Sequence, residues 1–266
     1  MDSLIKRIDR SFCDGWDRQA FTDYGTDQTY TYGDAATCVA YLHMLFSQLA
    51  IATGDKIAIW SVGCPNWGVS YFACVNHGFT AVPLLPDFSA TELTTIFQHC
   101  EVKALIVEES LLQRFEKCPQ NLPEIVINIS DFSVLKGSDG VTLESARSLQ
   151  IPAPFAQEDD IASIIYTSGT TGRSKGVVLT HKNLITNVIQ AQEIFPVKED
   201  SVSLSFLPLS HVFEFTAGFT FILSHGCCIY YLAKPPVVPA LLKAFENVRP
   251  HAAMSVPLVM EKIYKN

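Results

Sequence analysis

Hydrophobic and polar positions along this chain follow two alternating patterns. Short apolar runs predict buried strands, and apolar residues spaced three to four apart predict helices with one buried face. The runs predict strands at 56–61, 81–85, 104–107, 125–129, 161–166, 176–180, 201–206 and 228–232. The helical spacing, clearest at Val39, Leu42, Phe46 and Leu49, predicts helices at 34–49, 66–77, 89–100, 111–116, 236–246 and 257–264.

Local end signals support several of these helices. Gly78 follows the helix predicted at 66–77, as expected for a C-terminal cap. Ser89 and Glu92 have the spacing of a capping box at the start of the next helix. Because strands alternate with crossover helices, we predict an α/β fold with doubly wound, mostly parallel sheets.

One stretch, 137–160, is polar, contains Pro152 and Pro154, and is the best candidate for a linker. We therefore expect a first α/β subdomain over residues 1–150. Residues 151–266 are expected to hold a phosphate-binding hairpin and an incomplete second α/β subdomain.

The run from Tyr166 to Gly176 reads YTSGTTGRSKG and lies between two predicted strands. It is short enough to be the loop of a hairpin. Glycines let a backbone turn sharply and approach a ligand closely. Exposed N–H groups and hydroxyls can then donate to phosphate oxygens, with the Lys175 ammonium as a positive charge. This chemistry indicates a phosphate-binding loop, whereas a plain solvated Gly/Ser/Thr hairpin is the alternative.

The run is not a Walker loop, which needs glycine directly before the lysine and a helix after it. Here Ser174 precedes Lys175 and a strand follows. The order of residues instead resembles the signature loop of the adenylate-forming superfamily, which includes acyl-CoA synthetases, luciferases and peptide-synthetase adenylation domains. Ser174 departs from the proline usual in that family, a change that removes no phosphate donor.

A second motif, LPLSHVFE at 207–214, resembles the next motif of the same superfamily, in the form found in long-chain fatty-acyl-CoA synthetases. An isolated His211 would be interpreted as a core residue, but this motif places it beside the acyl pocket. Glu214 is either a functional carboxylate or the first-turn acid of a helix. Softer matches run from about Thr29 to the end, and Leu258 stands where the family has arginine.

The resemblance implies two half-reactions, in which a carboxylate attacks ATP to give an acyl-adenylate and a thiol then attacks the acyl group. The cofactors implied are ATP, Mg²⁺ and coenzyme A, and the substrate is a carboxylic acid, most simply a fatty acid. The implied phosphate-binding residues are Thr167, Ser168, Gly169, Thr170, Thr171, Gly172 and Lys175. Lys175 and His211 are the implied catalytic residues.

Later elements of the superfamily, which contact adenine, ribose and magnesium, are not found before Asn266. We therefore expect an N-terminal portion of a longer enzyme, inactive by itself, whose metal ligand lies beyond this sequence. An edge or apolar face left uncovered in the second sheet would favour dimerisation.

Composition narrows the classes of function. The formal net charge of −8 and the lack of a basic run argue against nucleic-acid binding. Eight cysteines without a Cys-x-x-Cys pair and an N-terminus unlike a signal peptide favour a reducing, cytoplasmic location. The most apolar stretch, 213–233, is interrupted by polar residues and is too short for a transmembrane segment.

Two alternatives remain open at this point. One is a non-catalytic nucleotide-binding protein, a short homologue without the second half of the enzyme. The other is an adenylating enzyme that loads a carrier protein, or uses oxygen, in place of coenzyme A.

Overall fold

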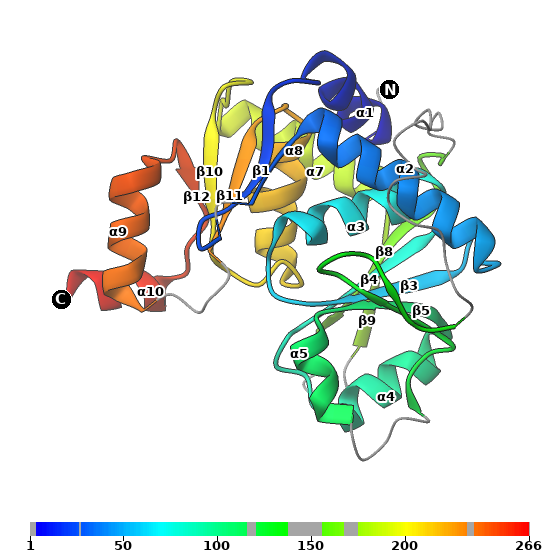
Figure 1. Ribbon diagram of the computed structural model, residues 1–266. Coiled ribbons are helices and arrows are strands. Elements are labelled where there is room, and N and C mark those ends of the chain that lie inside the picture. The colour runs from blue at the N-terminus through cyan, green and yellow to red at the C-terminus, as the bar shows by residue number, and fades with distance from the viewer. Residues whose placement is uncertain are drawn as a thin grey trace.

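The computed structural model describes residues 4–26, 28–115, 121–137, 156–167, 175–232 and 237–265. Two largely parallel sheets have helices packed on their faces (Figure 1). The predicted α/β class is therefore confirmed. None of the described helices has the length and hydropathy that a transmembrane span requires.

The larger sheet has seven strands in the order β7-β6-β5-β3-β4-β8-β9. Their bounds are β3 Lys56–Trp60, β4 Thr80–Leu84, β5 Val102–Val107, β6 Ile125–Asn128, β7 Val134–Lys136, β8 Ile161–Thr167 and β9 Lys175–Thr180. The five inner strands are parallel, and the edge strands β7 and β9 run antiparallel to their neighbours. The inner strand β4 is buried along its whole length, as expected for a parallel sheet covered on both faces.

The smaller sheet has five strands in the order β12-β10-β11-β1-β2. They are β1 Gln19–Asp23, β2 Thr29–Thr31, β10 Val202–Ser205, β11 Cys228–Tyr231 and β12 Ala252–Ala253. Strand β1 runs parallel to β11, with Phe21 opposite Ile229. The start of the chain therefore completes a sheet whose other strands lie near residues 200–253.

Strands of each sheet come from both sides of residue 150. β8 and β9 extend the sheet formed by residues 56–136, and β1 and β2 extend the sheet formed by β10–β12. The division into subdomains 1–150 and 151–266 stays a prediction. Most of the predicted linker, 138–155, lies outside the described residues.

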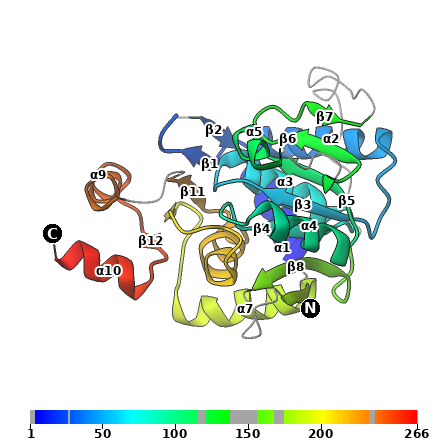
Figure 2. The same ribbon diagram turned by 90° about the horizontal axis from the view of Figure 1, so that it is seen from below.

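The helices are α1 Leu4–Asp14, α2 Tyr32–Gln48, α3 Pro65–Asn76, α4 Ala90–His99, α5 Glu109–Leu112, η1 Gln113–Phe115, α7 His181–Ile194, η3 Glu214–Thr220, α8 Phe221–Leu223, α9 Val238–Val248 and α10 Pro257–Tyr264. The Ser89–Glu92 capping box is present at α4, and both halves of it form. Thr180 and Asn183 form a similar box at α7. In both views α9 and α10 lie outside β12, away from the seven-stranded sheet (Figures 1 and 2).

Helix α3 lies at the centre of the core, and every one of its residues is buried. Trp67 and Tyr71 of α3 stack with centroids 5.7 Å apart, and Phe219 of η3 meets the Trp67 ring edge-on at 5.3 Å. Aromatic side chains bury large apolar areas, and edge-to-face pairs add about 0.5–1.5 kcal/mol each. This cluster connects α3 to the segment that follows His211.

Candidate active site

The predicted phosphate-binding hairpin has the expected stem. β8 and β9 pair antiparallel, and Thr167 lies directly opposite Lys175. Ser168, Gly169, Thr170, Thr171 and Gly172 lie outside the described residues. Because β8 is parallel to β4, the loop leaves the carboxyl edge of the larger sheet, the edge at which ligands bind in open α/β folds.

The stem is tightly packed next to the loop. A Cβ atom at Gly176 would lie 3.0 Å from Ile164 Cγ2 and 3.3 Å from Tyr166 Cζ, so glycine permits the Tyr166 ring to cover the neighbouring strand. The Tyr166 hydroxyl is hydrogen-bonded to His99 Nδ1 of α4, 2.7 Å away. Burial raises the pKa of Tyr166, so the phenol stays protonated at neutral pH. This bond connects the base of the loop to α4, and no motif in the sequence indicated it.

Lys175 is exposed at the start of the edge strand β9. Val177 and Val178 on the same strand are 43% and 52% exposed. Since an edge strand has neighbours on one side only, an incoming ligand can reach the Lys175 ammonium without displacing packed side chains. The phosphate contact of Lys175 stays a prediction.

His211 follows strand β10 and is exposed, together with Val212 and Phe213. Its N–H donates to the Pro208 carbonyl at 2.9 Å, and its own carbonyl accepts from the Phe215 N–H at 2.9 Å. The backbone here is therefore fixed while the imidazole is accessible. The interpretation of His211 as a core histidine is wrong, because a core histidine would be buried.

Glu214, by contrast, is fully buried at the start of the π-helix η3. Ser205 Oγ, at the end of β10, donates to Glu214 Oε1 at 2.6 Å. No described residue makes a hydrogen bond to Oε2. Burial raises the pKa of this carboxyl from 4.5 to about 7, against the lowering effect of the serine. Glu214 therefore connects η3, which follows His211, to the end of β10, which precedes it. It is the acid in the first turn of η3, and in addition it makes this contact between elements.

Close approach at Gly218 makes room for this carboxyl. A Cβ atom there would lie 2.5 Å from Glu214 Oε1, which is closer than real contacts allow. π-Helical turns carry a conformational cost and are frequent at functional sites. The arrangement of Ser205, Glu214 and Gly218 thus fixes the conformation of the segment that presents His211.

The two predicted parts of the site are connected through α7. This helix starts directly after β9 and packs against η3. Among the described residues, no group of three or more His, Cys, Asp or Glu side chains has the geometry to hold a metal ion. The hairpin stem, α7 and the His211 segment are thus contiguous in the structure.

A family model described as "AMP-binding enzyme" matches residues 12–266. The chain belongs to this family. One curated relative is the peroxisomal long chain acyl-CoA synthetase 6 from Arabidopsis thaliana, which is 31% identical over 249 residues. The match covers 88% of this chain and 35% of the relative. Fatty acyl-CoA synthetase A from Dictyostelium discoideum is 26% identical over 234 residues, covering 82% of this chain and 34% of the relative.

Solved structures of low sequence identity share the fold. ATP-bound MatB from Rhodopseudomonas palustris superposes with a TM-score of 0.82 at 21% identity, covering all of this chain and 52% of that one. The inhibitor-bound N-terminal domain of FACL13 from Mycobacterium tuberculosis gives 0.85 at 21% identity, covering all of this chain and 66% of that one. The chain spans about a third of the length of the two curated relatives named, 35% and 34%.

Proposed function

We propose that this chain is the N-terminal part of an ATP-dependent acid–thiol ligase. The reaction would convert a fatty acid, ATP and coenzyme A into acyl-CoA, AMP and pyrophosphate. Membership of the AMP-binding enzyme family supports the proposal, as does the similarity to long-chain acyl-CoA synthetases. The structural observation that carries it is the pairing of Thr167 with Lys175 at the base of the signature loop.

In the first step a carboxylate oxygen of the acid attacks the α-phosphorus of ATP. The bond between that phosphorus and the oxygen leading to the β-phosphorus breaks, and pyrophosphate leaves with the bonding electrons. Thr167, Ser168, Thr170 and Thr171 donate hydrogen bonds to the β- and γ-phosphates, and Gly169 and Gly172 permit the turn. Lys175 neutralises the charge that develops on the departing pyrophosphate.

In the second step the thiol of coenzyme A attacks the acyl carbonyl carbon and AMP leaves. We assign His211 a role in shaping the carboxylate and acyl site. Its exposed position on a hydrogen-bonded backbone supports this assignment. Magnesium would neutralise part of the charge on the ATP phosphates. The described residues offer no carboxylate set for it, so we assign no protein ligand to it.

The decisive experiment is to read the gene beyond codon 266 and assay the encoded protein with a fatty acid, ATP and coenzyme A. Acyl-CoA, AMP and pyrophosphate in equal amounts are expected, and Lys175→Ala should lower kcat. Transfer of the acyl group to a carrier protein, or ATP binding without turnover, would contradict the proposal and select one of the alternatives.

Lys175 can also be tested in this chain alone. Mg-ATP binding should weaken by about tenfold or more in Lys175→Ala, because a charge-assisted hydrogen bond contributes about 1.5–3 kcal/mol. Isothermal titration measures the change, and Lys182→Ala is the matched control, an exposed lysine at the start of α7. If Mg-ATP binds both variants with equally reduced affinity, Lys175 acts only through the net charge of the chain and not through a direct contact. By itself the chain is not expected to catalyse ATP–pyrophosphate exchange.

A further inference from the structure

A basic cavity lies on the opposite edge of the smaller sheet from the His211 segment. Its volume is about 390 Å³, within the range of small-molecule pockets. Residues 197–199 and 224–226 line it and lead into β10 and β11. Because β10 and β11 are parallel, these residues lie at the amino edge, whereas His211 follows the carboxyl end of β10. The cavity is therefore separate from the candidate active site.

Helix α1 forms one wall of the cavity. Arg7, Arg10, Ser11 and Asp14 line it from positions that share one face of a helix. The opposite, apolar face of α1 is buried in the core. Arg7 Nη1 donates to Gln192 Oε1 of α7 at 3.1 Å, which orients the guanidinium and uses only one of its several N–H donors.

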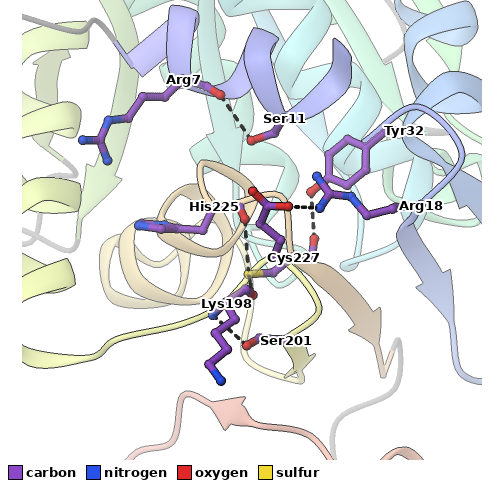
Figure 3. Close-up of polar contacts among 9 residues, drawn as sticks. Arg7, Ser11, Arg18, Tyr32, Lys198, Ser201, His225 and Cys227 are labelled. Atoms are coloured by element: carbon purple, nitrogen blue, oxygen red, sulfur yellow. Dashed lines mark hydrogen bonds and ion pairs between the residues drawn. The ribbon is translucent and has the colours of Figure 1, made fainter. Parts of the chain in front are cut away.

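The turn before β11 forms the facing wall. The Nδ1–H of His225 donates to the Phe221 carbonyl at 2.8 Å, so Nε2 of the neutral ring is an acceptor that a water or a protonated ligand oxygen can satisfy. Burial lowers the pKa of His225, and the positive charge of Arg7 lowers it further. Figure 3 shows the Arg7 and His225 side chains extending to the same side of the close-up.

Two buried polar atoms in the cavity wall have no hydrogen-bond partner among the described residues. They are Arg18 Nε and His225 Nε2. Arg18 also forms an ion pair with Glu199. Buried polar groups without partners are costly, and a ligand or water commonly satisfies them.

We propose that this cavity binds a small, soluble phosphate-containing anion such as a diphosphate. Guanidinium groups match the geometry of phosphate oxygens, and Arg7 and Arg10 supply two of them from adjacent turns of α1. Among the described lining residues Val197 is the only large apolar one, so the cavity does not suit an acyl chain. The proposal is independent of the function proposed above.

The test is titration of this chain with sodium pyrophosphate in the Lys175→Ala background, which removes the predicted contact at the hairpin. Saturable binding is expected there. Arg7→Gln with Arg10→Gln should weaken it at least about tenfold, since two charge-assisted contacts are lost. The control pair Lys6→Gln with Lys262→Gln removes equal charge outside the cavity and should leave affinity unchanged. No saturable binding, or equal loss in both pairs, would overturn the site.

A variant that should bind more tightly separates loss of a ligand contact from misfolding, because a misfolded chain would not gain affinity. Glu199→Gln removes a carboxylate from the cavity and releases the Arg18 guanidinium, so pyrophosphate should bind several-fold more tightly. Unchanged or weaker binding would contradict the proposal.

Sedimentation with phosphatidylcholine vesicles, with and without phosphatidic acid, identifies the source of the phosphate. Arginine-dependent binding to the acidic vesicles without pyrophosphate binding would overturn the assignment to a soluble ligand.

Discussion

At the scale of single residues, the candidate site depends on how each side chain is solvated. His211 and Glu214 lie three positions apart in one motif, yet the imidazole is exposed and the carboxyl is completely buried. The exposed group can meet a ligand directly. The buried group acts through the backbone, by holding the end of β10 against η3 through Ser205.

The raised pKa of Glu214 predicts a specific dependence of stability on pH. The folded carboxyl titrates at about 7 and its ordinary value is 4.5, so the folded state binds more protons between these values. The stability that the protonated carboxyl confers is therefore fully present below pH 4.5, and it is lost as the pH rises through 7. Over that range Glu214→Gln should gain up to about 3 kcal/mol of unfolding free energy relative to the unsubstituted chain.

Urea unfolding at about pH 5 and about pH 8 measures the effect. Glu246→Gln, at an exposed position on α9, is the control and should follow the unsubstituted chain at both values. If the unfolding free energies of the Glu214→Gln variant and of the unsubstituted chain change equally between the two pH values, the buried carboxyl does not titrate in this range.

At the scale of elements, the hairpin is held by its neighbours on one side. Its inner strand pairs with β4, and Tyr166 reaches α4 through His99. The outer strand β9 is an edge. The hairpin is thus supported from one side and open on the other, as a loop that admits a polar ligand requires.

Tyr166→Phe should destabilise the chain by about 1 kcal/mol, because the bond to His99 is lost while the ring still packs on Gly176. The urea unfolding midpoint measures the loss. Tyr264→Phe is the matched control, since that tyrosine is 92% exposed. If both variants unfold at the same midpoint, the hydrogen bond does not support the hairpin.

At the scale of the whole molecule, one end exposes apolar side chains. Leu258, Met260 and Tyr264 of α10 are 62%, 55% and 92% exposed, and β12 beside them is an edge strand. Such a surface favours association. The dimer expected from the sequence stays a prediction. A cytoplasmic location also stays a prediction, because two relatives carry a peroxisomal name.

If α10 mediates association, Leu258→Lys with Met260→Lys should shift the chain toward monomer. Sedimentation velocity at several concentrations measures the change. Substituting Val177 and Val178 by lysine tests the edge that β9 forms in the larger sheet. A monomer at all concentrations for the unsubstituted chain would rule out the predicted dimer.

Much of the fold was predictable because its signals are local. The apolar runs of β3, β4, β8 and β9 and the Ser89–Glu92 box involve residues that are neighbours in sequence. The short strands β1, β2, β7 and β12 were missed. The helices α1 and α7 were missed as well, although α1 is amphipathic and α7 begins with a capping box. Tertiary packing rather than local propensity holds such elements in place.

By itself the sequence determined the α/β class, the hairpin stem and the family, since motif spacing and periodicity are properties of the chain alone. Only the tertiary structure decided that β1 pairs with β11 and that β8 joins β4, because those partners are distant in sequence. It also decided the burial of Glu214 and the bond between His99 and Tyr166. Burial and long-range contacts depend on what the rest of the chain places around a residue, so no local pattern encodes them.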